Sequence, residues 1–206
     1  MAKNFAEKNP QQLIKLSGKD TFVEVLNNPF EIGKIVFGFA KYNEKAEPGK
    51  RITDNIQMYM DLDEALVFAH DILSGKIPQL AKIEKDKGTP YPKEVYKKQG
   101  GTSAARLTAS GKERPDKAPE SRVFKLSPGG KVDFILTAEK GKGEESNTGL
   151  IIQKKVETKV LVPISADDLK RLAIVIQSNI QAYRMARYVD GSAMKNPYQE
   201  QQKKSS

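Results

Sequence analysis

Two segments of the chain share an alternating pattern of apolar and polar positions that ends at the start of a helix. Residues 56–60 read IQMYM and residues 160–164 read VLVPI, so every second side chain of each is apolar. Because side chains alternate between the two faces of a strand, each segment is expected to be a strand with one buried face. Asp61 and Ser165 come next, and their side-chain oxygens suit a helix N-cap. A carboxylate stands three residues after each cap, where the helix dipole favours it.

Similar alternation and turn signals predict further strands before each of these helices. Strands are expected at residues 21–26, 34–42, 56–60, 122–126, 131–139, 150–155 and 159–164. Helices are expected from Asp61 to near Gly75 and from about Ala166 to Tyr188. The predicted fold class is therefore α+β, with two pseudo-repeated units of antiparallel β-sheet followed by a helix, paired within one chain. A built-in pair of this kind is more typical of a binding surface than of a catalytic pocket.

One stretch interrupts this plan. Residues 87–120 hold four prolines, the pair Gly100-Gly101 and many basic residues, with few large apolar side chains to bury. A loop of this length is uncommon inside a domain, so it is expected to be a basic linker or a mobile loop. The predicted organisation is a flexible arm at 1–20, a first unit at 21–86, this linker at 87–120, a second unit at 121–190 and a disordered tail at 191–206.

The final predicted helix has a wide apolar surface. Its main stripe consists of Leu169, Leu172, Ala173, Ile176, Ile180 and Tyr183. Ile174 and Val175 extend that stripe beyond what one sheet needs to cover. We expect the additional apolar side chains to pack either on the helix of the first half or on another subunit. The second alternative would make a homo-oligomer through the C-terminal helix.

The charge of the chain favours a polyanionic partner. Among 206 residues, 35 Lys and Arg exceed 26 Asp and Glu, which gives a net charge of +9. Such an excess suits nucleic acid or an anionic membrane surface, although a merely basic protein is the alternative. The chain has no cysteine, its apolar runs are too short for a membrane span, and residues 1–5 lack the apolar core of a signal peptide. We therefore expect a cytoplasmic protein without a membrane partner.

The sequence lacks the common motifs of zinc-dependent, serine-nucleophile and nucleotide-hydrolysing enzymes. His70 is the one histidine, and the absence of cysteine argues against a zinc site. No G-x-S-x-G or Walker-type motif is present. The neighbouring carboxylates Asp61/Asp63 and Asp167/Asp168 could bind Mg²⁺, but helix capping is the simpler explanation. We expect a protein that is not an enzyme, with no catalytic residue, metal or other cofactor.

Basic and aromatic residues on the predicted strands are candidates for binding a nucleic acid. Single strands are held by cations along their backbone and by aromatic rings against their bases. The candidate binding residues are Lys34, Lys41, Tyr42, Arg51, Tyr59, Arg122, Lys125, Lys131, Lys154, Lys155 and Lys159. The alternative is that these lysines are solvated strand edges; Phe37, Phe39 and Phe134 are expected to be core. Lys112, Arg114 and Lys117 of the linker are the next candidates if the strands do not bind.

The order of strands and helix resembles that of single-stranded DNA-binding transcriptional coactivators and plant whirly proteins. The resemblance rests on residues 122–188, with residues 21–75 as a divergent first copy, and includes no diagnostic motif. It implies paired units with DNA lying over curved sheets. Small basic proteins of this kind also resemble accessory proteins of phages and conjugative elements.

The sequence therefore favours a non-enzymatic protein that binds single-stranded DNA, or RNA, largely without regard to sequence. Its expected role is in DNA replication, recombination or transfer. A protein-interaction adaptor, with the last helix as its contact surface, is an alternative from a different class. A transcriptional regulator that binds duplex DNA is a weaker alternative, because the chain lacks a clear helix-turn-helix.

Overall fold

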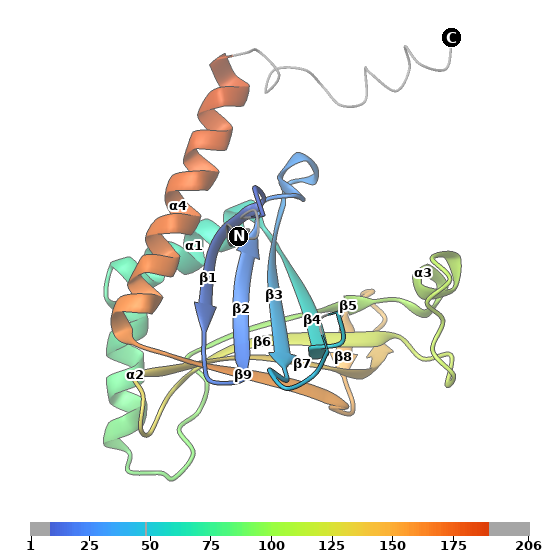
Figure 1. Cartoon of the computed structure of the whole chain (residues 1–206), viewed down its shortest axis with the longest axis horizontal. Coiled ribbons are helices and arrows are strands. Elements are labelled where there is room, and N and C mark those ends of the chain that lie inside the picture. The colour runs from blue at the N-terminus through green and yellow to red at the C-terminus, as the bar shows by residue number, and fades with distance from the viewer. Residues whose placement is uncertain (1–8, 48, 190–206) are drawn as a thin grey trace, which may run out of the picture.

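The fold consists of two antiparallel sheets, each made of successive strands and each followed by a helix. The structure is a computed structural model, and it describes residues 9–47 and 49–189 (Figure 1). The first sheet has its strands in chain order: β1 (Gln12–Ser17), β2 (Thr21–Leu26), β3 (Lys34–Tyr42) and β4 (Ile52–Asp61). A 3₁₀ turn, η1 (Phe30–Ile32), links β2 and β3, and helix α1 (Leu62–Leu73) follows β4 directly.

The second sheet repeats this plan with two additions. Its main strands pair in the order β5 (Tyr96–Thr102), β6 (Glu120–Pro128), β7 (Phe134–Glu145) and β9 (Thr158–Ile164), and helix α4 (Ala166–Val189) follows. The short strand β8 (Ile151–Gln153) pairs with the far end of β7, and helix α3 (Ala104–Ala109) interrupts the connection from β5 to β6. Helix α2 (Lys76–Asp86) joins the two units. The predicted α+β class with paired sheet-plus-helix units is confirmed.

The strand-to-helix junctions have the predicted caps in both units. The Asp61 amide donates to the Glu64 carboxylate at 3.3 Å, as in a capping box. In the second unit the Asp168 amide donates to the hydroxyl of Ser165 at 3.1 Å. Each carboxylate thus lies at the positive end of its helix. Capping therefore accounts for Asp61 and Asp168, one member of each acidic pair.

The two sheets pack face to face around one core, with their strands running across each other (Figure 1). Phe37 and Phe39 of β3 lie against Phe124 of β6, with ring centroids 5.3 and 5.8 Å apart. All three side chains are fully buried. Tilted and edge-on aromatic contacts of this kind add to the apolar area that they bury. Phe37 and Phe39 are therefore core residues, as expected, and the third phenylalanine expected in the core, Phe134, is also buried.

Helix α4 packs against α1 of the first unit, so the two halves share helix contacts as well as the sheet interface. Its apolar stripe from Leu169 to Ile180 is buried, and Val175 packs against the core. Arg184 binds Asp63 of α1 at 2.5 Å. This packing within the chain accounts for most of the wide apolar surface, while Ile174 stays 49% exposed. Association of two chains through α4 stays a prediction.

Two segments that were expected to be irregular contain regular structure. Residues 12–17, within the predicted arm at 1–20, form the edge strand β1, because Ile14 and Leu16 point into the core. Within the predicted linker at 87–120, residues 96–102 form β5 and residues 104–109 form α3. β5 is ordered by pairing with β6 along its length, and α3 is capped by Ser103 and buries Leu107.

Two of the predicted strands have different bounds in the structure, and several other predictions on the organisation of the chain are not tested by it. The predicted strand at 150–155 is only the three-residue β8, and the one at 131–139 begins at Phe134. The mobility of residues 87–120 without a ligand and the unit boundaries stay predictions. The first eight residues and the predicted tail at 191–206 lie outside the described residues. Among the described helices, none is long and apolar enough to cross a bilayer.

Candidate nucleic-acid interface

A basic groove lies where the second sheet extends beyond β4, the open edge of the first sheet. It consists of two hollows of about 490 and 300 Å³ that share Arg122. We call it the β4 groove. Its polar and charged lining includes Lys34, Asn55, Gln57, Tyr59, Asp61, Lys98, Gln99, Thr102, Arg106, Lys112, Glu120, Arg122 and Lys140. Three parts of the chain that are distant in sequence therefore meet at one surface.

Each side of the groove comes from a different element. The side chains of Asn55, Gln57 and Tyr59 follow one another along β4. Arg122 of β6 and Lys140 of β7 are cross-strand partners in the second sheet and form the floor. The third side is the α3 arm, residues 103–118, which projects from the end of the second sheet (Figure 1).

Cations outnumber carboxylates in the lining by six to two. Three of these cations are paired: Lys34 with Asp61 at 2.5 Å, Lys98 with Glu64, and Arg122 with Glu120 at 2.6 and 2.9 Å. Within residues 9–47 and 49–189, no hydrogen bond or ion pair engages the charged groups of the other three, Arg106, Lys112 and Lys140. These three side chains can therefore bind an anion without first releasing a carboxylate.

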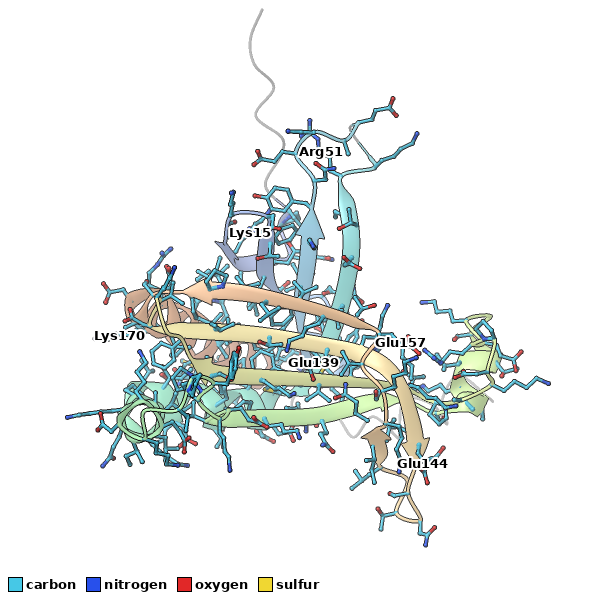
Figure 2. All side chains as sticks on the ribbon, turned by 90° about the horizontal axis from the view of Figure 1, so that it is seen from below. Lys15, Arg51, Glu139, Glu144, Glu157 and Lys170 are labelled. Carbon is cyan, nitrogen blue, oxygen red and sulfur yellow. The ribbon has the colours of Figure 1, made fainter. Side chains whose placement is uncertain are left out.

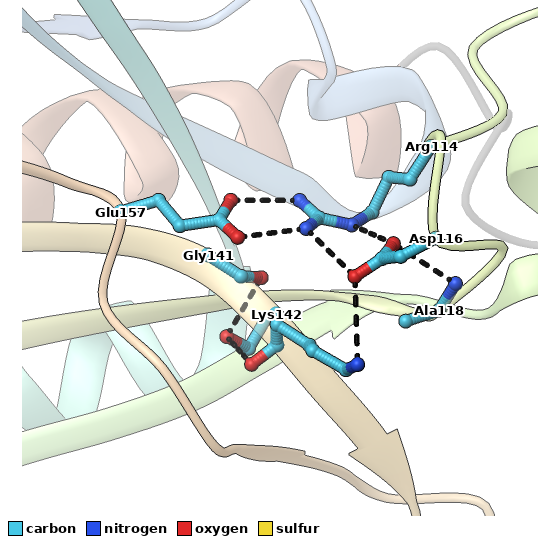
Figure 3. Close-up of polar contacts among 7 residues, drawn as sticks. Arg114, Asp116, Ala118, Gly141, Lys142 and Glu157 are labelled. Carbon is cyan, nitrogen blue, oxygen red and sulfur yellow. Dashed lines mark hydrogen bonds and ion pairs between the residues drawn. The ribbon is translucent and has the colours of Figure 1, made fainter.

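The α3 arm is anchored at its base by a network around Arg114 (Figure 3). The Arg114 guanidinium donates two hydrogen bonds to Glu157, between β8 and β9, and two to Asp116 of the arm. Lys142 of β7 lies 3.6 Å from Asp116. The hydrogen bonds from Arg114 and the Ala118 amide lower the pKa of Asp116 to about 2. The carboxylates of this network are thus ionised near neutral pH and hold the arm against the sheet.

Three of the eleven sequence-predicted residues meet in the groove: Lys34, Tyr59 and Arg122. Tyr59 is 42% exposed, so its ring is accessible to a ligand. Tyr42 lies elsewhere on the first sheet, where it packs on Phe22 and donates to the Lys19 carbonyl at 3.0 Å. Lys41 lies at the exposed end of the same strand.

The other predicted residues are spread over separate surfaces. Arg51 lies in the loop before β4, far from the second sheet (Figure 2), and Lys154 pairs with Glu144 on the β7–β8 hairpin at 2.5 Å. Lys131 lies in the turn before β7, and Lys155 in the connection after β8. A role for these residues in binding stays a prediction.

Lys125 and Lys159 both bind Glu139. Glu139 lies on the face of the second sheet that points away from the first sheet (Figure 2). The two lysine ammonium groups are 2.7 and 3.3 Å from the carboxylate, which is nearly buried. Burial raises the pKa of Glu139, but the hydrogen bonds and charges of the two lysines outweigh burial, so the pKa is below its usual range. The carboxylate thus engages both of these predicted binding residues and offsets one of their two positive charges.

Several groove residues were absent from the sequence-based set. These are Asn55, Gln57, Lys98, Arg106 and Lys140. The sequence held one relevant signal, the basic character of residues 87–120, and Lys112 from that segment does line the groove. The described residues contain no group of three or more His, Asp or Glu side chains placed to hold a metal ion.

Comparisons with known proteins give one likeness, at the level of structure. The chain matches no protein-family model. It also has no significant sequence similarity to a curated protein. Among solved structures it is similar to the crystal structure of WHY1 from Arabidopsis thaliana, with a TM-score of 0.45 and 7% identity over 89% of this chain and 93% of that chain. A likeness of this size carries no information on what the groove binds.

Proposed function

We propose that this chain is a non-enzymatic protein that binds single-stranded nucleic acid in the β4 groove, largely without regard to sequence. The observation that carries the proposal is that the two adjoining hollows of the groove together present three unpaired cations and an exposed tyrosine. Cations neutralise the phosphates of a strand, and an aromatic ring can stack on its bases. The net charge of +9 would add a general attraction for polyanions. A role in DNA replication, recombination or transfer follows as the biological context.

A second candidate uses the same surface in a different way. β4 is the last strand of its sheet, so no other strand of the described residues pairs with its outer edge. An extended peptide could add to this edge, as in other proteins that bind by strand addition. This would be an interaction adaptor, with the peptide on β4 rather than on α4.

Anisotropy titrations with labelled single-stranded DNA, duplex DNA and RNA at several salt concentrations test the proposal. We expect preference for single strands and a linear fall of log K with log salt. The informative variant is Arg106→Gln/Lys112→Gln. Loss of two phosphate contacts should flatten the slope by about 1.4, at about 0.7 per contact.

The matched control is Lys82→Gln/Lys170→Gln, which removes the same charge from exposed positions on α2 and α4. Lys170 lies at the opposite end of the second sheet from the α3 arm (Figure 2). If the two double variants bind equally, the groove is not the binding site. A preference for duplex would instead favour the transcriptional regulator, and no binding to nucleic acid would favour the adaptor.

A further inference from the structure

The sides of the β4 groove differ in chemistry. The β4 side carries the uncharged groups of Asn55, Gln57 and Tyr59 in succession, all three exposed. The opposite side and the floor carry the unpaired cations Arg106 and Lys140, together with Lys112. The cation nearest to β4, Lys34, is neutralised by Asp61. Unpaired positive charge thus lies on the α3 arm and the floor of the groove, away from the β4 side.

From this asymmetry we infer how a ligand is oriented, and the inference rests on the proposed function. A single nucleic-acid strand lies with its bases against β4 and with its phosphates against the α3 arm and the floor of the groove. Phosphates follow positive charge, and the unpaired positive charge of the groove is on the arm and the floor. The amides of Asn55 and Gln57 each offer both donors and acceptors, as base edges do. Tyr59 offers a ring for stacking.

The spacing of the β4 side chains suits successive bases of an extended strand. Residues two apart on a strand are separated by about 6.6 Å and point the same way. Asn55, Gln57 and Tyr59 therefore form a row parallel to the groove, and the Tyr59 hydroxyl lies 3.3 Å from the Gln57 side-chain oxygen. In a duplex the Watson–Crick edges are paired and the base faces are stacked, so only the edges in the grooves would be left for the β4 side. This orientation names the ligand class as a strand with free Watson–Crick edges and predicts selectivity against duplex.

The orientation can be tested by removing bases or cations separately. The ligands are a thymidine oligonucleotide and an abasic oligomer of the same length, which has the same phosphates but no bases. The protein variants are Asn55→Ala/Gln57→Ala/Tyr59→Ala, Arg106→Gln/Lys112→Gln, and the charge control Lys82→Gln/Lys170→Gln. All the substituted side chains are exposed, and thermal melts of each variant verify that it is folded.

We expect the β4 variant to bind the thymidine oligonucleotide at least about fivefold more weakly, since stacking alone contributes about 1–3 kcal/mol per base. Its affinity for the abasic oligomer should match that of the parent. The arm variant should weaken binding of both ligands by the same factor and flatten both salt slopes. The inference is overturned if the β4 variant weakens both ligands alike or neither, or if the arm variant weakens only the ligand with bases. If the parent binds neither ligand at low salt, the proposed function itself fails.

Discussion

Arg114 and Glu157 form a two-point salt bridge between segments 43 residues apart, with Nη1 2.9 Å and Nη2 2.8 Å from the two carboxylate oxygens. This fork geometry fixes direction as well as distance, because both guanidinium nitrogens must face both oxygens. It connects the α3 arm to the chain just before β9. The position of Arg106 and Lys112 over the groove therefore depends on a contact outside the groove.

Replacing Arg114 by Gln should loosen the arm without unfolding the sheets. The amides of Leu107, Ser110 and Lys112 are held by hydrogen bonds within the arm. They should exchange with solvent faster in Arg114→Gln, while the amides of β6 and β7 keep their protection. Hydrogen exchange followed by NMR measures both sets. As a control, Arg171→Gln removes an exposed pair with Asp168 on α4 and should leave the arm unchanged; equal protection of the arm in all three proteins would contradict the anchoring role.

The same network should respond to acid but not to changes near neutral pH. The pKa of Asp116 is lowered from 3.8 to about 2. A carboxylate with a lowered pKa stabilises the folded arm above its ordinary pKa, and this stabilisation is lost as the pH falls from about 4 towards 2. NMR titration of the side-chain carboxyl carbons should show Asp116 among the last aspartates to protonate. In Arg114→Gln its pKa should rise towards 3.8, and an unchanged titration would show that Arg114 is not the cause.

Two adjacent glycines of β5 should respond very differently to substitution. A Cβ added at Gly101 would lie 2.4 Å from the Glu120 carbonyl oxygen and 2.8 Å from Ile151 of β8. A Cβ added at Gly100 would have nothing nearer than 3.8 Å. Gly101→Ala should therefore lower the free energy of unfolding by about 1–3 kcal/mol, and Gly100→Ala should change it by less than about 0.5 kcal/mol. Chemical denaturation of both variants gives the comparison; equal stability would contradict the close approach of Glu120 and Ile151 to Gly101.

The variant Glu139→Gln tests whether nucleic acid binds to the outer face of the second sheet or in the β4 groove. Loss of the charge-assisted bonds to Lys125 and Lys159 should lower the free energy of unfolding by about 1–3 kcal/mol. Because the pKa of Glu139 is lowered, this contribution should be present above about pH 4.5 and be lost in acid. The substitution also frees two lysines on that face. If nucleic acid binds in the groove, affinity should rise only slightly through net charge; a gain as large as the loss in Arg106→Gln/Lys112→Gln would place the strand on the outer face.

The parts of the fold that could be predicted are those encoded by neighbouring residues. Alternation over residues 56–60 and 160–164, followed by Asp61 and Ser165, was enough to predict both strand-to-helix junctions. β1 and β5 were missed because edge strands are specified by their pairing partners more than by their own composition. β5 reads YKKQGGT and gains its order from pairing with β6 along its whole length.

The groove could be predicted only in part, because it is a product of tertiary packing. Lys34, Tyr59 and Arg122 were identified as basic or aromatic residues on strands, which is a local property. Their proximity, and the contribution of Arg106 and Lys140, depends on how far the second sheet extends past β4. The pairing of Lys125 and Lys159 with Glu139 depends on the register between β6, β7 and β9. This register cannot be read from the amino-acid sequence alone.

The two sheet-plus-helix units of the chain differ in one respect. The α3 arm and β8 interrupt the second unit, and the corresponding connections of the described first unit have no such additions. Two identical subunits related by a twofold axis would present two equivalent grooves, and a strand could enter them with opposite directions. Here one unit supplies the edge and the other supplies the arm. A single chain thus offers one β4 groove whose two ends differ. We therefore expect one nucleic-acid strand to bind per chain, with a fixed 5′-to-3′ polarity.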